Sequence, residues 1–137
     1  MDLSKLPSTF YRVSLKAFIF DSQDRLLLGK TEDGKWEPPG GGWEHDETIE
    51  ECLSRELKEE LGINSASFGE IIVIYRGRNR RGFETIKIAV RTTVEDNNFR
   101  FGELISAEYK SKEELPGLDF STDEGGIKKV VDKIWPE

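Results

Sequence analysis

The sequence has very few of the residues that form disulfides or activate nucleophiles: one cysteine, Cys52, and one histidine, His45, among 137 residues. A single cysteine cannot form an internal disulfide. Cys52 is predicted to be a packed thiol rather than a nucleophile, because His45 lies in a loop and no other base is offered nearby. Disulfide scaffolds and thiol catalysis are therefore not expected.

Positive charge is in the minority, since 20 lysines and arginines face 27 aspartates and glutamates, giving a net charge of −7. This balance argues against non-specific binding to nucleic acid or to anionic membranes. No apolar run is long enough to cross a bilayer and no signal-peptide pattern is seen, so we expect a cytoplasmic protein. The length suits a single domain over residues 1–137.

What the sequence does contain is a glycine loop that runs into a carboxylate-rich helix, within Gly40–Ile63. Thr48 and Glu51 have the spacing of a capping box, which predicts that the helix begins at Thr48. Gly62 is predicted to end it, as glycine commonly does after the last turn. At about 100° per residue, the apolar side chains of this helix form one arc, and Glu60 falls inside that arc.

Glu56, Glu59 and Glu60 lie within one turn of this helix. At about 6 Å and an effective dielectric near 20, each pair repels by roughly 2 to 3 kcal/mol. Arg55 and Lys58 fall on the opposite side of the helix, so a divalent cation is the better partner for the three carboxylates. Ligands made only of oxygen select Mg²⁺ or Mn²⁺ over zinc. A solvated, salt-bridged helix is the alternative, and the position of Glu60 argues against it.

A fixed spacing runs through the stretch: Gly41, five residues, Glu47, seven residues, and then Arg55–Ile63 with the sequence Arg-Glu-Leu-Lys-Glu-Glu-Leu-Gly-Ile. This pattern resembles the signature box of the Nudix hydrolases at every defining position. The preceding Trp36–Gly41, Trp-Glu-Pro-Pro-Gly-Gly, resembles the lead-in common in that family. One departure is Asp46, where many members carry glycine, and we expect it to alter only the turn of the loop.

The resemblance implies a magnesium-dependent hydrolase that acts on a nucleoside diphosphate linked to another group X. In such enzymes water attacks a phosphorus of the pyrophosphate while metal ions neutralise the phosphate oxygens. The resemblance also implies that Arg55 and Glu47 pair to hold the helix against the loop. Arg55 is therefore counted among the catalytic candidates.

A further glutamate, on a loop before the last strand, often completes the metal site or acts as a base in the family. Glu103 takes that place here, with Glu108 and Glu95 as alternatives. The general base is left open among Glu59, Glu60 and Glu103. The implied metal ligands are the backbone carbonyl of Gly40 and the carboxylates of Glu56, Glu59, Glu60 and Glu103.

Four residues are candidate substrate contacts. Arg12 and Lys30 stand at the ends of expected strands, where simple exposed charge and phosphate contact are the two interpretations. Trp43 lies in a loop that should be solvated, so it is a candidate for stacking on a substrate or partner. Arg78 belongs to the one basic cluster, residues 76–82, which is either a soluble hairpin tip, the interpretation we favour, or a lid that grips polyphosphate.

Alternating apolar residues predict strands at 12–20, 25–30, 70–75 and 84–94, and helical spacing predicts a closing helix at 123–135. The first two strands are expected to pair as a hairpin across the turn at 21–24. Periodicity alone gives one domain of the α plus β type. The resemblance implies an α/β fold, a Nudix-like α/β/α sandwich whose helices cover both faces of a central mixed β-sheet.

The expected substrate is a nucleoside triphosphate, normal or oxidised, cleaved to monophosphate and pyrophosphate. The alternatives are a nucleotide sugar, a dinucleoside polyphosphate, or a Nudix-like module that binds a nucleotide without cleaving it. The expected partner is thus a small nucleotide, with no nucleic acid and no membrane, and the family allows a homodimer. Aromatic candidates for stacking on the base, most of them expected in the core, are Phe10, Tyr11, Tyr75, Phe83, Phe99 and Phe101.

Overall fold

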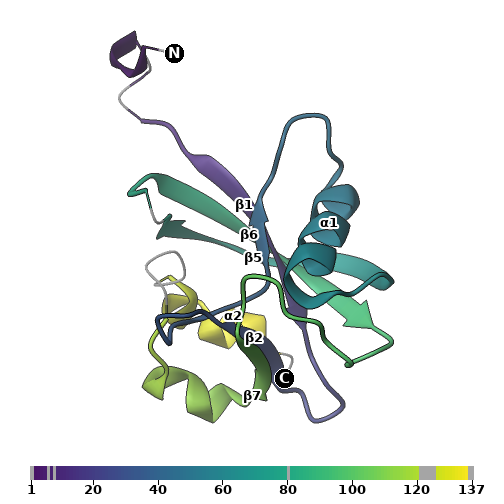
Figure 1. Cartoon of the computed structure of the whole chain (residues 1–137). Coiled ribbons are helices and arrows are strands. Elements are labelled where there is room, and N and C mark those ends of the chain that lie inside the picture. Colours follow the sequence, from purple (N-terminus) through teal and green to yellow (C-terminus); the bar gives the residue numbers. More distant parts are fainter. Residues whose placement is uncertain (1, 6, 8, 80, 121–125, 136–137) are drawn as a thin grey trace.

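Two β-sheets form the centre of the computed structural model, which describes residues 2–5, 7, 9–79, 81–120 and 126–135 (Figure 1). The first sheet has the strand order β4-β1-β6-β5, with β1 parallel to β6 and the other two pairs antiparallel. The second sheet is antiparallel, in the order β3-β2-β7. The strands are β1 (Arg12–Ile19), β2 (Leu26–Lys30), β3 (Trp36–Glu37), β4 (Gly40–Gly42), β5 (Ala66–Arg78), β6 (Glu84–Val94) and β7 (Ser106–Lys110).

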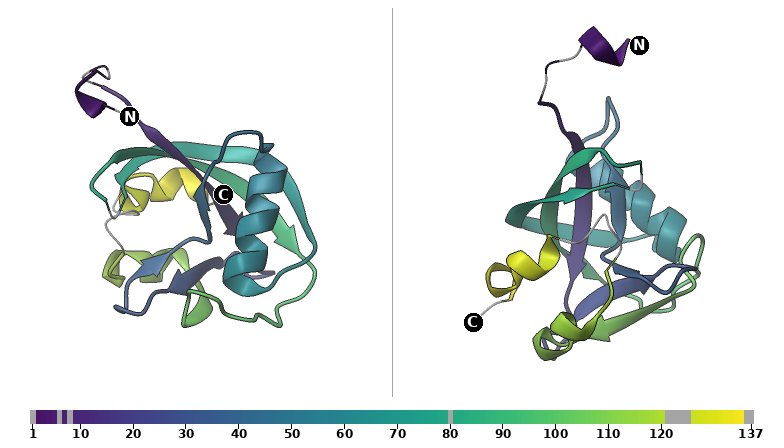
Figure 2. Two further views of the ribbon diagram at one scale, coloured as in Figure 1. Left: turned by 45° about the horizontal axis from the view of Figure 1, so that its top comes forward. Right: turned by 90° about the vertical axis from the view of Figure 1, so that its left-hand side faces the viewer.

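Helices lie on both sides of the central strand β1 (Figure 2). The helical elements are α1 (Ile49–Leu61), α2 (Val131–Ile134) and the 3₁₀ turns η1 (Leu3–Lys5), η2 (Lys112–Gly117) and η4 (Ile127–Lys129). One core contains Leu15, Ala17 and Ile19 of β1 against the apolar face of α1. The other contains Phe18 with residues of η4 and α2. The expected α/β sandwich with a mixed sheet is therefore confirmed.

The ends of α1 are the ones predicted. The Thr48 hydroxyl accepts a hydrogen bond from the Glu51 N–H at 3.1 Å, and the Glu51 carboxylate accepts one from the Thr48 N–H at 3.0 Å. Gly62 closes the helix in the left-handed conformation, with φ 68°. These contacts span only three or four residues, which explains why the sequence alone places them. None of the described helices is long and apolar enough to cross a membrane.

Two predicted elements differ in the structure. The expected hairpin of the first two strands is wrong: only the bridge Phe20–Leu26 joins them, and β2 pairs with β3 and β7 instead. Both edges of β1 are already taken, by β4 and β6. The closing helix at 123–135 is also wrong as one element, because Val130, at φ −118° and ψ 10°, separates η4 from the short α2. Residues 123–125 lie outside the described residues.

Candidate active site

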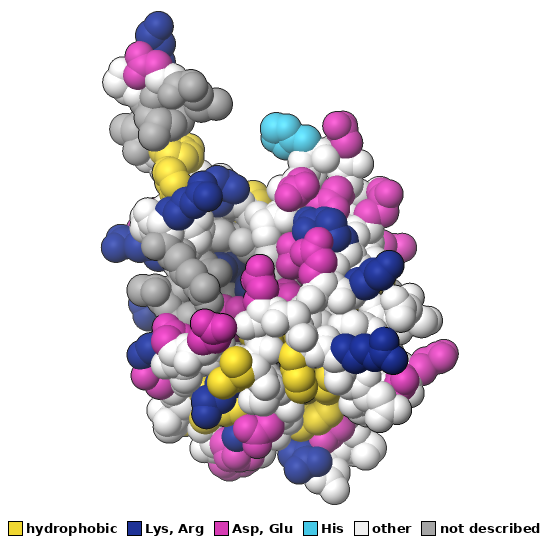
Figure 3. All heavy atoms as spheres, in the orientation of Figure 1, with side chains coloured by type: hydrophobic (Ala, Val, Ile, Leu, Met, Phe, Trp, Pro, Cys, Tyr) yellow, Lys and Arg dark blue, Asp and Glu magenta, His cyan; other side chains and the backbone are white. Residues whose placement is uncertain are grey.

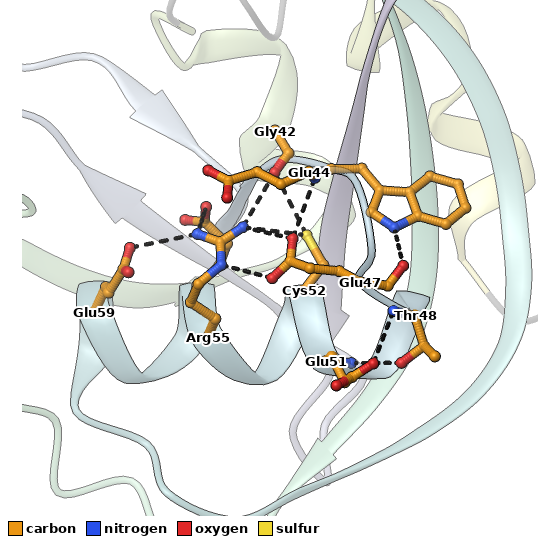
Figure 4. A network of polar contacts seen from close by, with 10 residues as sticks. Gly42, Glu44, Glu47, Thr48, Glu51, Cys52, Arg55 and Glu59 are labelled. Carbon is orange, nitrogen blue, oxygen red and sulfur yellow. Dashed lines mark hydrogen bonds and ion pairs between the residues drawn. The ribbon is translucent and has the colours of Figure 1, made fainter.

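Arg55, in the middle of α1, ties the helix to the glycine loop (Figure 4). Its Nε and Nη2 donate to the two carboxylate oxygens of Glu47 at 2.7 and 3.0 Å, and Nη2 also donates to the Gly42 carbonyl at 3.2 Å. A two-pronged guanidinium–carboxylate pair fixes orientation as well as charge. The Arg55–Glu47 pair expected from the resemblance is therefore confirmed.

Arg55 also reaches the acidic cluster, contrary to the helical-wheel prediction that placed it on the far side. Its Nη1 donates to Glu56 Oε1 at 2.8 Å and lies 3.7 Å from Glu59 Oε2. The wheel places Cα atoms, whereas an arginine side chain is long enough to curl around the helix. The helix thus carries one of the counter-charges for its own carboxylates.

The Arg55–Glu47 pair predicts a specific pH dependence of stability. The pair lowers the pKa of Glu47 from its ordinary value of 4.5 to about 2. A lowered carboxyl pKa contributes stability that is present above pH 4.5 and is lost as the pH falls toward 2. Urea unfolding of the wild type and Glu47→Gln should therefore differ above pH 5 and converge as the pH falls toward 2. A difference that does not change between pH 6 and 3 would contradict the ion pair.

Glu60 is the buried member of the cluster, with 6% of its surface exposed. Its Oε1 accepts a hydrogen bond from the Gly40 N–H at 2.9 Å. Burial raises the pKa of Glu60 well above its ordinary value, and the positive charge of Lys16 together with the Gly40 N–H partly offsets this effect. Glu60 is therefore a desolvated carboxylate, held in place by the backbone of the glycine loop.

Gly40 makes this contact possible through its backbone conformation. Its φ is 139°, a region that residues with a side chain rarely adopt, and a Cβ at this position would lie 2.1 Å from the Leu15 carbonyl oxygen. The close approach of β4 to β1 directs the Gly40 N–H toward α1. The implied role of the Gly40 carbonyl as a metal ligand stays a prediction.

A cavity of about 400 Å³ opens beside the Gly40–Gly42 strand. The acidic side chains on its wall come from three separate parts of the chain, β3, α1 and the loop before β7; they are Glu37, Glu56, Glu60 and Glu103. Basic side chains on its wall are those of Arg12, Lys16 and Arg81. Figure 3 shows the corresponding hollow, with acidic side chains gathered over α1 on one side and basic ones over the N-terminal strand on the other. The cavity therefore presents both carboxylates and cations to a ligand.

A second cavity of about 480 Å³ lies next to the first and shares Glu37, Glu60 and Glu103 with it. The loop before β7 positions Glu103 through backbone hydrogen bonds. The Arg100 and Gly102 N–H groups donate to the carbonyls of Leu61 and Glu60 at 2.8 and 3.2 Å, so the loop caps the C-terminal end of α1. Glu103 thereby comes to the same cavity as Glu60, although the two residues are far apart in the sequence.

The structure brings five of the predicted site residues to the first cavity: Arg12, Gly40, Glu56, Glu60 and Glu103. Glu59 is not among the lining residues, and its side chain is 60% exposed beside Arg55. Glu59 lies one residue before Glu60 and so projects from a different side of the helix. The predicted convergence of all three helix carboxylates is therefore not seen here.

Three predicted substrate contacts lie away from the lining of this cavity. Lys30 Nζ lies over the Trp36 ring, 5.5 Å from its centroid, and its proposed contact with phosphate stays a prediction. Trp43 points back at its own loop, because its Nε1 donates to the Glu47 carbonyl at 2.9 Å. Arg78 pairs with Glu84 across the hairpin at 3.0 Å, while its neighbours Asn79 and Arg81 line the cavity.

Sequence reasoning missed two charged residues of the cavity, Lys16 and Glu37. Lys16 is only 2% exposed, and its Nζ donates to the Pro38 carbonyl at 3.3 Å. The available signal was a lysine flanked by apolar residues in the middle of a predicted strand, where burial of a charge is costly unless it is paired. Glu37, between Trp36 and Pro38, gave a similar signal beside a buried aromatic ring.

Cys52 behaves as predicted. It is fully buried, and burial raises the pKa of its thiol to about 12. Its Sγ donates to the Gly42 carbonyl at 3.6 Å. A neutral, buried thiol is a poor nucleophile.

Comparison with known proteins gives one family. The family model described as NUDIX domain matches residues 10–132. A relative from Gluconacetobacter diazotrophicus named RNA pyrophosphohydrolase is 37% identical over 75 residues, which cover 47% of this chain and 43% of that protein. A MutT-like protein from Streptomyces ambofaciens is 35% identical over 71 residues, covering 51% and 46%. The chain thus spans less than half the length of these curated relatives.

Solved structures share the fold. The MutT protein from Methanosarcina mazei Go1 superposes with a TM-score of 0.77 at 23% identity, covering 94% of this chain and 96% of that one. An ADP-ribose pyrophosphatase from Streptococcus suis gives a TM-score of 0.72 at 20% identity, covering 91% and 90%. At these identities the likeness concerns the fold alone.

Proposed function

Because the chain belongs to the NUDIX domain family, we propose that it is a metal-dependent pyrophosphohydrolase that cleaves a nucleoside diphosphate linked to another group X. One observation carries this proposal. The buried Glu60 carboxylate faces a cavity that is also lined by Arg12, Lys16 and Arg81. Carboxylates suit a hard divalent ion and the cations suit phosphate oxygens. Residues 1–137 are proposed to act as one domain.

The donor set fits Mg²⁺ or Mn²⁺. Among the described residues, no three acidic, histidine or cysteine side chains are already gathered as a metal cluster. Glu56 and Glu60 nevertheless face one cavity, where a bound cation would offset the free-energy cost of burying the Glu60 carboxylate. We propose that Glu56, Glu60 and Glu103 hold the metal, with Glu59 and the Gly40 carbonyl as further ligands. A bound ion would neutralise pyrophosphate oxygens and activate water.

The chain's own residues supply orientation. Arg55 holds Glu56 and the glycine loop in place, and the Gly40 N–H fixes the Glu60 carboxylate. Of the three candidates for the general base, Glu60 and Glu103 line the cavity and Glu59 lies outside its lining. We therefore favour Glu60 or Glu103 as the group that accepts a proton from the attacking water.

A nucleoside triphosphate, normal or oxidised, is the proposed substrate, with cleavage to monophosphate and pyrophosphate. A second candidate is the triphosphate at the 5′ end of an RNA, favoured by the relatives named RNA pyrophosphohydrolase and by the two arginines of the cavity wall, Arg12 and Arg81. This candidate differs from the expectation of no nucleic-acid partner. A cytoplasmic location and a homodimer stay predictions.

The test is product release from a substrate panel with Mg²⁺ or Mn²⁺. The panel contains nucleoside triphosphates, nucleotide sugars, dinucleoside polyphosphates and a 5′-triphosphorylated RNA. Metal-dependent pyrophosphate release from the triphosphates, absent in EDTA, is the expected result. Binding of nucleotide and metal without any turnover would instead support a non-catalytic binding module.

The two arginines of the β5–β6 hairpin should differ in their effects. Arg81 lines the cavity, whereas Arg78 is engaged with Glu84. Arg81→Ala should raise KM about tenfold or more, because a charge-assisted hydrogen bond contributes about 1.5 to 3 kcal/mol. Arg78→Ala, the matched control on the same hairpin, should leave KM within twofold. Equal effects on steady-state KM would show that the hairpin acts only through its general charge.

A further inference from the structure

The described lining of the cavity supplies carboxylates, cations and glycine backbone, with Val13 as the one apolar residue among those described. Such a lining suits phosphate and metal, but it offers no flat apolar surface for a nucleobase. Two aromatic residues lie next to residues of this lining: Phe10 precedes Arg12 by two residues, and the Phe83 N–H donates to the Asn79 side chain at 2.9 Å. Phe10 is 40% exposed, and its ring centroid lies 6.0 Å from that of the half-buried Phe83.

Phe10 and Phe83 lie just before the neighbouring strands β1 and β6. Arg12 pairs with Thr85 and Ser14 pairs with Lys87 in this parallel ladder. Side chains two residues apart along a strand share a face. Phe10 precedes Arg12 by two residues and Phe83 precedes Thr85 by two, just outside the strands, so an extended chain there would continue the row of Arg12 and Ser14. The 6.0 Å between the two ring centroids agrees with this placement.

The residue between Phe10 and Arg12 follows the same alternation. Tyr11 lies in the other direction, with the Arg76 guanidinium over its ring at 5.7 Å from the centroid. At about 3.3 Å per residue, Phe10 stands roughly 7 Å from Arg12 along the strand. Figure 3 shows apolar side chains at the foot of the N-terminal arm, directly beside the basic side chains that flank the hollow.

We propose that Phe10 and Phe83 form the subsite that stacks on the nucleobase of the substrate. The proposal rests on the proposed function, because it places the phosphates in the cavity that Arg12 and Arg81 line. Stacking uses the π-face that every base has and does not read hydrogen-bonding edges. The enzyme therefore accepts all four bases, and purines bind ahead of pyrimidines because their larger rings cover more aromatic surface.

The test compares a ligand that has a base with one that has none. The probes are α,β-methylene-ATP, which carries a carbon bridge at the bond to be cleaved, and inorganic tripolyphosphate, both titrated with Mg²⁺ by calorimetry. Phe10→Ala should weaken binding of α,β-methylene-ATP by about five- to a hundredfold, the range for losing one base–aromatic stack. Tripolyphosphate binding should stay within twofold. Phe10→Trp should restore nucleotide binding.

Tyr11→Ala is the matched control, since it removes an aromatic ring from the same segment that lies against the Arg76 guanidinium rather than against Phe83, and it should leave both ligands unchanged. Equal weakening of both ligands by Phe10→Ala, or no weakening of either, would overturn the base subsite. If Phe10→Ala weakened neither ligand, the two rings would contact something other than the nucleobase. Nucleotide binding that depends on Phe10, found in a chain without turnover, would retain the subsite and overturn only the proposed hydrolysis.

Discussion

Glu60→Gln should lower the rate of pyrophosphate cleavage by about 10²- to 10⁴-fold, the usual range for losing a group that transfers a proton or holds a metal. Glutamine keeps the shape of Glu60, and its side-chain oxygen can still accept the hydrogen bond from the Gly40 N–H. What it loses is the negative charge that faces the cavity.

The same variant should not lose stability. Burial raises the pKa of Glu60, and a carboxyl whose pKa is raised on folding makes the folded state less stable once the pH exceeds its unfolded value near 4.5. Removing the charge removes this penalty, so Tm at pH 7 should be equal to or above that of the wild type. If the Glu60 charge stabilised the fold, Glu60→Gln would instead lower Tm.

The control is Glu50→Gln on the same helix, at an exposed position in its first turn. It should keep both the rate and Tm of the wild type. Initial rates at saturating Mg²⁺ and a thermal scan of each variant are sufficient. If Glu60→Gln kept more than a tenth of the wild-type rate, Glu60 would be neither base nor essential ligand, and Glu103 would take that place.

Gly40→Ala should reduce both stability and activity. A residue with a side chain is strained at the φ of 139° found here, which costs about 1 to 3 kcal/mol, and the added Cβ would lie 2.1 Å from the Leu15 carbonyl oxygen. The backbone must therefore shift, and we expect a loss of about 3 kcal/mol or more in the free energy of unfolding, or roughly 10 °C in Tm.

Gly42→Ala is the control within the same strand, because nothing lies within 4 Å of the Cβ it would add. Its Tm should change by less than about 2 °C, as for a substitution without a steric contact. If Gly40→Ala is folded, the metal concentration that it needs for activity is worth measuring, because the backbone N–H at position 40 would no longer hold the Glu60 carboxylate in place. Equal melting temperatures for the two variants would contradict the described approach of β4 to β1.

The parts of the site that the sequence predicted are held by short-range interactions. Thr48, Glu51 and Gly62 set the ends of α1 through contacts within one helical turn. The Glu47–Arg55 pair, which the resemblance to the family implied, joins the loop to the helix across eight residues of the chain. The position of Glu60 inside the apolar arc correctly predicted its burial.

The parts that the sequence left undetermined come from distant segments. Lys16 on β1, Glu37 on β3 and Arg81 on the hairpin share a cavity only because three separate strand pairings place them there. The choice between Arg78 and Arg81 as the cavity residue depends on which side of the hairpin each side chain occupies. A shift of one residue would exchange the two.

The sequence by itself determined the acidic character of the chain, the helix Ile49–Leu61 with both its ends, and membership of the NUDIX domain family. These follow from composition and from interactions between neighbours in the chain. Only the tertiary structure decided that β2 joins a second sheet, that Lys16 and Glu37 face Glu60, and that Phe10 lies beside Phe83. The reason is that strand pairing joins residues far apart in sequence, and no local pattern specifies which edge of a sheet a strand will occupy.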